Sequence, residues 1–298
     1  MRIRYFICGA AMLAVSSLAP SSAPLSSAHA AESYDNCNNF IDTVPATVNS
    51  QGVWCLRHDV NTALTGGAAI NVQANNVTID CNNFKLGGLS AGAGTSAWGI
   101  QATDRLNTTV RHCNIRGFAE GIYFTGASGG GHVVEDNRFD GNTYTSIYVE
   151  GDGSVVRRNA VHDTGGSTFA SYVGQAQGIR TTYDVDILDN SFDGIAPAAD
   201  GSSNGSAWGI ISYSSNGGSA IKGNHVRGLA PLGAGASNAI YSGSSSLVTI
   251  DDNDLIGSSA GNGITCSGTD TRARDNIVKH FTTGLNGCGD AGGNDITP

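Results

Sequence analysis

The segments VVEDNRF (133–139), VVRRNAV (155–161) and DILDNSF (186–192) share one pattern: two alternating apolar residues, then Asn, then an apolar residue two positions later. The same pattern recurs on both sides of them, as VTIDCNNF (77–84), TVRHCNI (109–115), AIKGNHV (220–226), TIDDNDL (249–255) and RARDNIV (272–278). Copies that return every 22 to 34 residues are typical of a solenoid, in which each repeat stacks on the next.

A second unit lies between the copies and consists of a small residue followed by Ile or Leu. It occurs nine times, at Ala69-Ile70, Gly99-Ile100, Gly121-Ile122, Ser146-Ile147, Gly178-Ile179, Gly209-Ile210, Ala239-Ile240, Gly263-Ile264 and Gly284-Leu285. Strand alternation directs the Ile, Val and Phe positions inward. We therefore predict an all-β parallel solenoid of about nine rungs over residues 69–298. Each rung has one strand at the Ile, one before the Asn and a short one after it.

The Asn positions also have a structural explanation. Stacked side-chain amides at a turn bond to the backbone and to one another, which satisfies polar groups buried where the chain bends inward. We expect such a ladder at Asn82, Asn137, Asn159, Asn190, Asn224, Asn253 and Asn276, with Cys113 in one Asn position.

The N-terminus predicts export. Arg2 and Arg4 precede an apolar stretch, and Ala28-His29-Ala30 offers a cleavage site, so residues 1–30 have the features of a signal peptide and residues 31–68 are left as an N-terminal cap. We expect a secreted protein, periplasmic or extracellular. The apolar stretch is too short to span a membrane, and no later segment could do so.

The charge of the chain restricts its partners. The formal net charge is −9, from 16 basic and 25 acidic residues, and loss of Arg2 and Arg4 leaves 14 against 25, or −11. This charge disfavours nucleic acid and anionic membranes as partners, and no surface suggests a dimer interface, so we expect a monomer.

The stretches PATVNSQGVWCL (45–56) and AINVQANNVTIDCNNFKLGG (69–88), with the repeats that follow, resemble secreted proteins with pectate-lyase-like repeats. The resemblance covers nearly all of the mature chain and implies a right-handed parallel β-helix. It does not specify a function, because that superfamily includes lyases, hydrolases, epimerases and non-catalytic surface proteins.

Six cysteines remain after the signal, and an even number in an exported protein indicates disulfides, although six cysteines allow fifteen pairings. On the rungs of a β-helix, Cys81 and Cys113 fall one position apart, Cys266 and Cys288 follow the last two Ile/Leu strands, and Cys37 and Cys55 precede the first rung. We predict these three pairs, with the outer two fastening the ends of the solenoid.

In the enzymes of this superfamily the substrate lies along the outer face of one strand of each rung, which by motif order is the Gly-Ile strand here. The first outward row of that face includes Gln101, Tyr123, Tyr148, Arg180 and Tyr241, and the next includes Glu150, Thr182 and Tyr213. The long connections 163–177, 195–207 and 230–238 enter these strands, and Trp208 lies beside them. Because sugars bind to aromatic faces and a few placed polar groups, we expect a polysaccharide to lie here. A purely structural tyrosine stripe is the alternative.

Cleavage of an acidic polysaccharide by β-elimination is the first hypothesis for activity. Arg180 would neutralise the uronate carboxylate, and Tyr148 or Tyr123 would transfer a proton if the Arg charge lowered its pKa. Glu150 would pair with Arg180 or bind a cation. We predict no cofactor and no metal site, and calcium dependence is left open.

Three alternatives stay open. The first alternative, hydrolysis, needs two carboxylates on either side of one bond. Asp251 and Asp252 are adjacent, so their side chains should point to opposite faces of the strand. Asp184 and Asp186 could share a face, but they lie at a turn beyond the groove strand. His162, outward between Asp140 and Asp193, could serve a uronate epimerase, although a charge-paired surface His is the simpler interpretation. The third alternative is a non-catalytic carbohydrate-binding or envelope-surface protein.

Overall fold

The computed structural model describes residues 36–214, 218–243, 248–268 and 270–298. The predicted signal peptide, residues 1–30, lies outside the described residues. Residues 33–298 form one compact unit. Among the described residues no helix is both long and apolar enough to cross a membrane.

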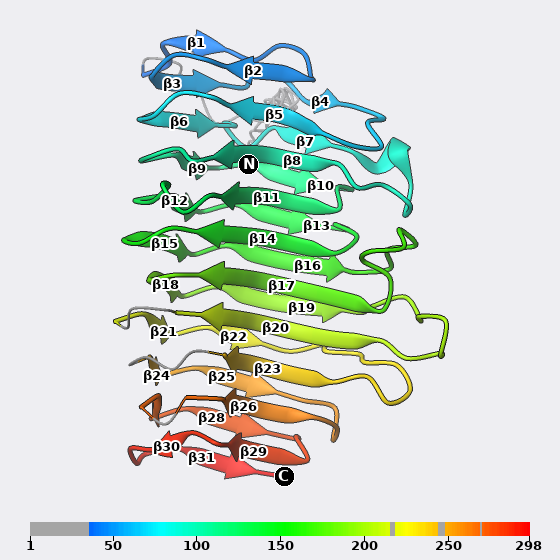
Figure 1. Ribbon diagram of the computed structural model, residues 1–298, viewed down its shortest axis with the longest axis vertical. Coiled ribbons are helices and arrows are strands. Elements are labelled where there is room, and N and C mark those ends of the chain that lie inside the picture. Colours follow the sequence, from blue (N-terminus) through cyan, green and yellow to red (C-terminus); the bar gives the residue numbers. More distant parts are fainter. Residues whose placement is uncertain (1–35, 215–217, 244–247, 269) are drawn as a thin grey trace, which may run out of the picture. The chain divides into compact units, whose positions relative to one another are not determined.

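Three parallel sheets make up this unit, and from β2 onward the chain visits them in a constant order, so that every third strand belongs to the same sheet (Figure 1). Sheet A holds β1 (Asn39–Phe40), β3 (Gly52–Cys55), β6 (Val77–Asp80), β9 (Thr109–Arg111), β12 (Val133–Glu135), β15 (Ser154–Arg157), β18 (Val185–Leu188), β21 (Ala220–Lys222), β24 (Thr249–Asp251), β27 (Arg272–Arg274) and β30 (Gly289–Asp290). Sheet B holds β2 (Ala46–Val48), β5 (Ala68–Val72), β8 (Trp98–Thr103), β11 (Glu120–Thr125), β14 (Thr145–Glu150), β17 (Gln175–Thr182), β20 (Ser206–Tyr213), β23 (Ser237–Ser242), β26 (Asn262–Cys266) and β29 (Thr283–Asn286).

Sheet C holds β4 (Val60–Asn61), β7 (Lys85–Gly87), β10 (Asn114–Arg116), β13 (Arg138–Asp140), β16 (Ala160–Thr164), β19 (Ser191–Ile195), β22 (His225–Val226), β25 (Asp254–Ile256), β28 (Ile277–Lys279) and β31 (Asp295–Thr297). One 3₁₀ turn, Leu89–Ala91, follows β7. The predicted β-helix is confirmed, with about ten rungs instead of nine. The additional strands come from both ends, and β2, β3 and β4 carry the three sheets into the segment 31–68 that the sequence suggested as a cap.

The Ile position predicted for each rung lies in the middle of a strand of sheet B. Ile100, Ile122, Ile147 and Ile179 are in register on consecutive strands and are fully buried. The same column continues through Ile210, Ile240 and Ile264. Each rung places its apolar side chains directly over those of the preceding rung. The hydrophobic core is therefore one continuous column along the solenoid.

The residue before each Ile faces the core as well. A Cβ built on Gly121 would lie 2.8 Å from the Phe139 ring and 2.6 Å from the Ser146 carbonyl oxygen, and one on Gly178 would lie 2.6 Å from the Phe192 ring. Two consecutive inward positions interrupt the strand alternation at this point. The residue preceding the glycine is thereby turned to the outer face of sheet B.

The predicted Asn ladder is present, but it begins and ends at other residues than predicted. Side-chain amides donate to the next Asn oxygen at 2.9–3.0 Å in the buried series Asn137, Asn159, Asn190, Asn224, Asn253, Asn276 and then Asn294. Asn294 was not predicted. Asn82 was predicted wrongly: its backbone has a φ of 47°, and its amide donates to the Leu56 carbonyl oxygen instead.

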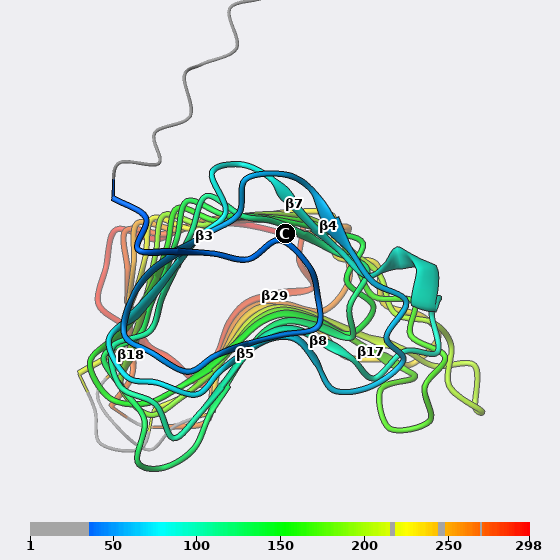
Figure 2. The same ribbon diagram turned by 90° about the horizontal axis from the view of Figure 1, so that it is seen from above.

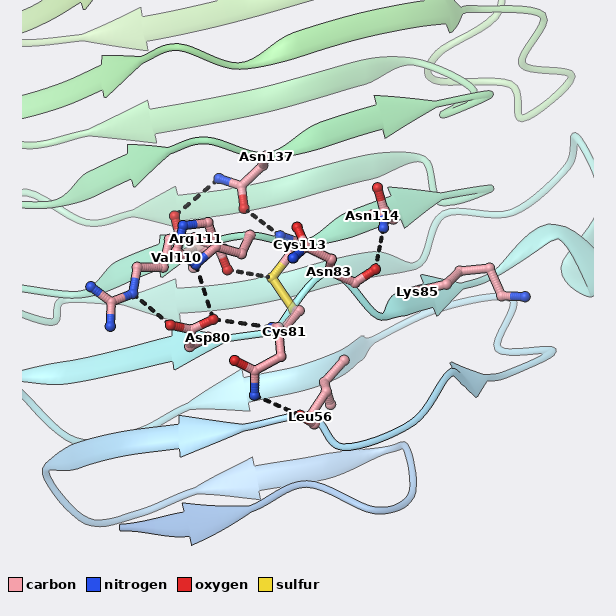
Figure 3. The surroundings of a disulfide bond; sticks show 12 residues. Leu56, Asp80, Cys81, Asn83, Lys85, Val110, Arg111, Cys113, Asn114 and Asn137 are labelled. Atoms are coloured by element: carbon pink, nitrogen blue, oxygen red, sulfur yellow. Dashed lines mark hydrogen bonds and ion pairs between the residues drawn. A yellow bond between two sulfur atoms is a disulfide. The ribbon is translucent and has the colours of Figure 1, made fainter. Parts of the chain in front are cut away.

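The three predicted disulfides, Cys37–Cys55, Cys81–Cys113 and Cys266–Cys288, are all present, and the first and last lie near the two ends of the solenoid. Cys113 also begins the ladder, since its backbone N–H donates to the Asn137 side-chain oxygen at 3.0 Å (Figure 3). Charges alternate beside it along sheet A, where Arg111 pairs with Asp80 at 2.7 Å. On the following rungs Arg157 pairs with Glu135, also at 2.7 Å.

Candidate functional site

The predicted outward row of sheet B is confirmed by its register. Gln101, Tyr123, Tyr148 and Arg180 are Cα partners on the adjacent strands β8, β11, β14 and β17, and the row continues through Ile211 to Tyr241. Glu150, Thr182 and Tyr213 form the next row. Residues distant in sequence thus become neighbours on one face.

Arg180 lies at the centre of this face. Its guanidinium carbon is 5.1 Å from the ring centre of Tyr148 and 5.6 Å from that of Tyr213. It forms no ion pair with a carboxylate of the described chain, and its buried Nε atom has no hydrogen-bond partner there. The side chain also lines a pocket of about 360 Å³ that includes Gln177, Trp208 and Tyr213. Its polar partner among the described residues is the phenol of Tyr144; burial raises the pKa of that phenol, and the hydrogen bond from Arg180 helps to lower it.

Tyr148 and Glu150 form a pair beside Arg180. The Tyr148 hydroxyl donates to Glu150 Oε1 at 2.5 Å, and the backbone N–H of Gly126 donates to Glu150 Oε2 at 2.8 Å. Burial, with the hydrogen bond to Glu150 next, raises the pKa of Tyr148 well above its usual range, and the opposing effect of Arg180 is the smallest. Arg180 does lower the pKa of Tyr148, but by too little to offset burial and Glu150, so the condition set for proton transfer by this phenol is not met by Arg180 alone. Glu150 is also bound by Tyr148 and Gly126 instead of pairing with Arg180.

Glu120 is a site residue that the sequence analysis missed. It is in register with Trp98 and Thr145 on the neighbouring strands, and only 4% of it is exposed. Burial raises the pKa of Glu120 to about 8, although the positive charge of Arg180 opposes the rise. Its Oε2 atom has no hydrogen-bond partner among the described residues. At neutral pH this carboxyl is mostly protonated and can donate a proton.

The position of Glu120 follows from the glycine bend. Counting back by two from Tyr123 gives Gly121, so alternation alone places Glu120 in the core. Because Gly121 faces the core beside Ile122, Glu120 lies instead on the outer side, where its charge raises the pKa of Tyr123. The pair of a small residue followed by Ile, repeated at every rung, was the one sequence signal that could have revealed the outward position of Glu120.

Aromatic rings line the N-terminal part of the face. Trp98 stacks on Tyr123 with ring centres 4.7 Å apart and planes within 5°. Tyr172, from the long connection after β16, stacks on Tyr144 at 4.3 Å, and Phe169 contacts Tyr172 at 5.2 Å. Figure 2 shows the connections that enter β17 and its neighbours projecting at one side of sheet B. The connection after β16 meets the face where Tyr172 stacks on Tyr144, whereas Trp208, predicted beside these connections, lies on strand β20.

The predicted residues toward the C-terminal end are also placed here. Trp208 contacts Tyr241 edge-on at 5.5 Å, and Tyr213 contacts Tyr241 at 6.0 Å. Thr182 lies in register between Glu150 and Tyr213 and its hydrogen bond to Tyr148 lowers the pKa of that phenol, though not enough to offset burial. The surface therefore extends across six strands of sheet B, from β8 to β23, with Arg180 in place of an aromatic ring on β17.

Two predicted residues lie elsewhere. His162 is on β16 of sheet C, in register between Asp140 and Asp193 as predicted, and is not part of the Arg180 face. Asp184 lies in the turn between β17 and β18, where it accepts a hydrogen bond from Ser214 at 2.7 Å. It lines a separate hollow with Asp186. The structure brings neither residue to Arg180.

The aspartates of sheet A are arranged differently from the prediction. Asp251 and Asp252 do not point to opposite faces, because Asp252 has a φ of 54° and Lys222 contacts both carboxylates, at 3.4 and 3.0 Å. Together with Asp275 they form a cluster whose oxygens could surround a cation. Arg274 pairs with Asp251 at 2.9 Å and with Asp275 at 3.2 Å, so these carboxylates are already engaged by cations of the chain.

Comparison with known proteins identifies the repeat. The family model for the right-handed β-helix region matches residues 46–207. No curated protein sequence matches the chain significantly. Among solved structures, the A-module of a mannuronan C-5 epimerase from Azotobacter vinelandii is similar, with 10% identity, a TM-score of 0.47 and coverage of 89% of this chain and 91% of the module.

A second solved structure is an alginate lyase described as a complex with G6. It has 14% identity and a TM-score of 0.30, and the match covers 87% of this chain and 59% of the lyase chain. At these levels of similarity neither structure assigns an activity or a substrate to this chain.

Proposed function

This chain belongs to the right-handed β-helix family, and we propose that it binds an extended acidic polysaccharide along the outer face of sheet B and cleaves it by β-elimination. The observation that carries the proposal is Arg180. It is a partly buried cation without an ion-pair partner among the described residues, it lies between the rings of Tyr148 and Tyr213, and the protonated carboxyl of Glu120 is nearby.

Binding would combine charge with flat apolar surfaces. An unpaired guanidinium holds a carboxylate with two parallel N–H donors, which fits the unsatisfied Nε of Arg180. Sugar rings would stack on the aromatic surface that begins at Trp98 and Tyr123 and ends at Tyr241. In a chain of net charge −9, one such cation on an aromatic face favours a uronate over a neutral sugar.

In the proposed elimination, the C5–H and C4–O bonds of the uronate break and a C4=C5 double bond forms. Arg180 stabilises the negative charge that develops on the carboxylate. The Tyr148 oxygen accepts the C5 proton while its own proton passes to Glu150, with which it already shares a 2.5 Å hydrogen bond. Glu120 donates its proton to the leaving oxygen. Water then carries one proton from Glu150 back to Glu120, which restores the starting protonation states.

Hydrolysis is the second candidate, and one observation favours it. The charges of Glu120 and Glu150 both raise the pKa of Tyr123, after the larger effect of burial, so two carboxyl groups lie close to the same ring. A protonated and an ionised carboxyl on either side of a glycosidic bond are the requirement for hydrolysis. Glu120 was not among the carboxylates considered from the sequence, and strand alternation alone would direct it into the core.

The test is incubation of the purified protein with acidic and neutral polysaccharides, with and without added calcium. Ultraviolet absorbance detects the unsaturated product of elimination, a reducing-end assay detects either cleavage, and sedimentation with insoluble polymer detects binding. Absorbance with new reducing ends supports the lyase, and reducing ends alone indicate the hydrolase. Binding without cleavage indicates a non-catalytic protein, and no binding to any acidic polymer overturns the proposal. Arg180→Ala is the diagnostic variant and Arg227→Ala, a surface ion-pair residue in the connection after β22, is its control.

We further propose that the protein works outside the cytoplasm as a monomer. The three disulfides support an oxidising compartment. Secretion of the full chain with loss of residues 1–30, read by N-terminal sequencing, tests export, and light scattering tests the monomer.

A further inference from the structure

Sheet C has a pocket of its own, distinct from the Arg180 face on sheet B. It has a volume of about 360 Å³, and its lining includes Lys85, Asn114, Arg116 and Arg138. These residues come from the adjacent strands β7, β10 and β13, near the disulfide Cys81–Cys113 (Figure 3). None of them takes part in the function proposed above.

The register explains why the cations converge. Leu86, Ile115 and Phe139 point into the core, so their neighbours along each strand point outward. Asn114 is the Cα partner of Lys85 on one side and of Arg138 on the other.

Arg116 follows two positions after Asn114 on the same strand face. Its Cα partner on β7 is Gly87, which has no side chain. The Asn61 side chain fills the space over Gly87. Lys85 and Arg138 lie at about one strand spacing, ~4.8 Å, on either side of Asn114.

The cations exceed the carboxylates that could neutralise them. Lys85 contacts Asp59 at 3.2 Å and Arg116 contacts Asp140 at 3.5 Å. Arg138 is exposed and forms no ion pair within the described part of the chain. The buried Nε atom of Arg116 likewise has no hydrogen-bond partner there.

The contrast with sheet A shows that this is not the usual pairing of the solenoid. There the ladder cations Arg111 and Arg157 contact their carboxylates at 2.7 Å, the distance of a strong charge-assisted hydrogen bond. In the sheet C pocket the ion-pair distances are longer, and Arg138 has no carboxylate partner among the described residues. The chain as a whole has a net charge of −9. Such a local excess of positive charge attracts an anion.

We propose that this pocket is a second ligand site, which binds an oxyanion: the carboxylate or the sulfate group of an acidic glycan. Arg138, which is exposed, donates to the oxygens, and Arg116 and Lys85 add positive charge on the other sides of the pocket. The site binds one charged group and has no aromatic platform, so it recognises the anion and not the sugar ring. It does not depend on the activity proposed for sheet B.

The experiment is a titration of the ¹⁵N-labelled full chain, at constant ionic strength, with sodium sulfate in one arm and with a free uronic acid in the other. Amide signals of Asn114 and Arg116 report on the pocket, and signals of Tyr148 and Arg180 report on sheet B. We expect saturable shifts at Asn114 and Arg116, and the arm with the lower dissociation constant identifies the preferred anion.

Variants distinguish a site from general screening. Arg138→Gln and Lys85→Gln should each weaken binding at Asn114 by about tenfold or more, since a hydrogen bond to a charged group is lost. Arg227→Gln, an exposed cation in the connection after β22, and Arg180→Ala should leave this binding unchanged. The proposal is overturned if the shifts do not saturate, if they occur equally at surface amides throughout the chain, or if Arg138→Gln binds as the unchanged protein does.

Discussion

The guanidinium carbon of Arg180 lies 5.1 Å from the centre of the Tyr148 ring, and the hydroxyl of the same tyrosine donates to Glu150 at 2.5 Å. One side chain therefore serves two purposes: its ring packs against the cation, and its oxygen belongs to a proton-sharing pair. The proposed roles of Tyr148 in binding and in chemistry can be separated by substitution.

Tyr148→Phe keeps the ring beside Arg180 and removes the hydroxyl. We expect polysaccharide binding to stay within about twofold, and turnover to fall by about a hundredfold or more, the usual contribution of a proton-transfer group. Tyr148→Ala should weaken binding as well. Binding by sedimentation and initial rates on the same polymer check this. Equal turnover in Tyr148→Phe would remove the hydroxyl from the mechanism.

The pKa of Glu120, raised from 4.5 to about 8, predicts a pH dependence of stability. The folded chain holds this proton more tightly than the unfolded chain, so its contribution to stability is complete below pH 4.5, declines as pH rises between 4.5 and 8, and is absent above 8. In Glu120→Gln the decline should be smaller. Thermal unfolding of both proteins across this range measures the difference, and identical pH profiles would show that Glu120 titrates normally.

The same carboxyl predicts an activity profile. If Glu120 donates the proton to the leaving group, activity must fall as pH rises through about 8, where the acid form is lost. Glu120→Gln should be almost inactive while still binding polymer, because the amide keeps the shape of the side chain. An active Glu120→Gln protein would assign the acid to another group.

Gly121 should tolerate no side chain. A methyl group there would meet the Ser146 carbonyl oxygen and the Phe139 ring, so Gly121→Ala should destabilise the fold by about 1–3 kcal/mol through overpacking. Gly201→Ala is the matched control, since nothing lies within 4 Å of its Cβ position. Chemical denaturation compares the two, and equal stabilities would argue against the inward bend that places Glu120.

The Asn ladder predicts that two Asn→Ala substitutions, one inside the stack and one outside it, lower the free energy of unfolding by different amounts. Asn190→Ala removes the buried hydrogen bonds that this side chain makes with Asn159, with Asn224 and with the Val156 carbonyl oxygen, and should cost at least about 2 kcal/mol of unfolding free energy. Asn82→Ala, outside the stack and half-buried, should cost less than about 1 kcal/mol. A similar loss in both variants would contradict the energetic importance of stacking.

The repeats alone were enough to predict most of the architecture. Stacked Ile and Asn positions recur because every rung must bury the same columns, and strand alternation then places Tyr148 beside Arg180 and Cys81 near Cys113. These inferences succeeded because they need only local periodicity and the requirement that successive rungs align.

Glu120 and the ends of the ladder needed the tertiary structure. Alternation assigns Glu120 to the core, and the packing of Gly121 against Phe139, two strands later in the same rung, turns it outward. Asn82 has the expected residue type, but a left-handed backbone directs its amide away from the stack.

The sequence by itself determined that the chain winds as a β-helix and which residues share the outer row of sheet B, because those properties follow from a repeated local pattern. The tertiary structure decided the chemistry of that row. The protonation of Glu120, the unpaired charge of Arg180 and the high pKa of Tyr148 depend on burial by side chains and long connections from other rungs, and no periodicity in the sequence encodes where those connections lie.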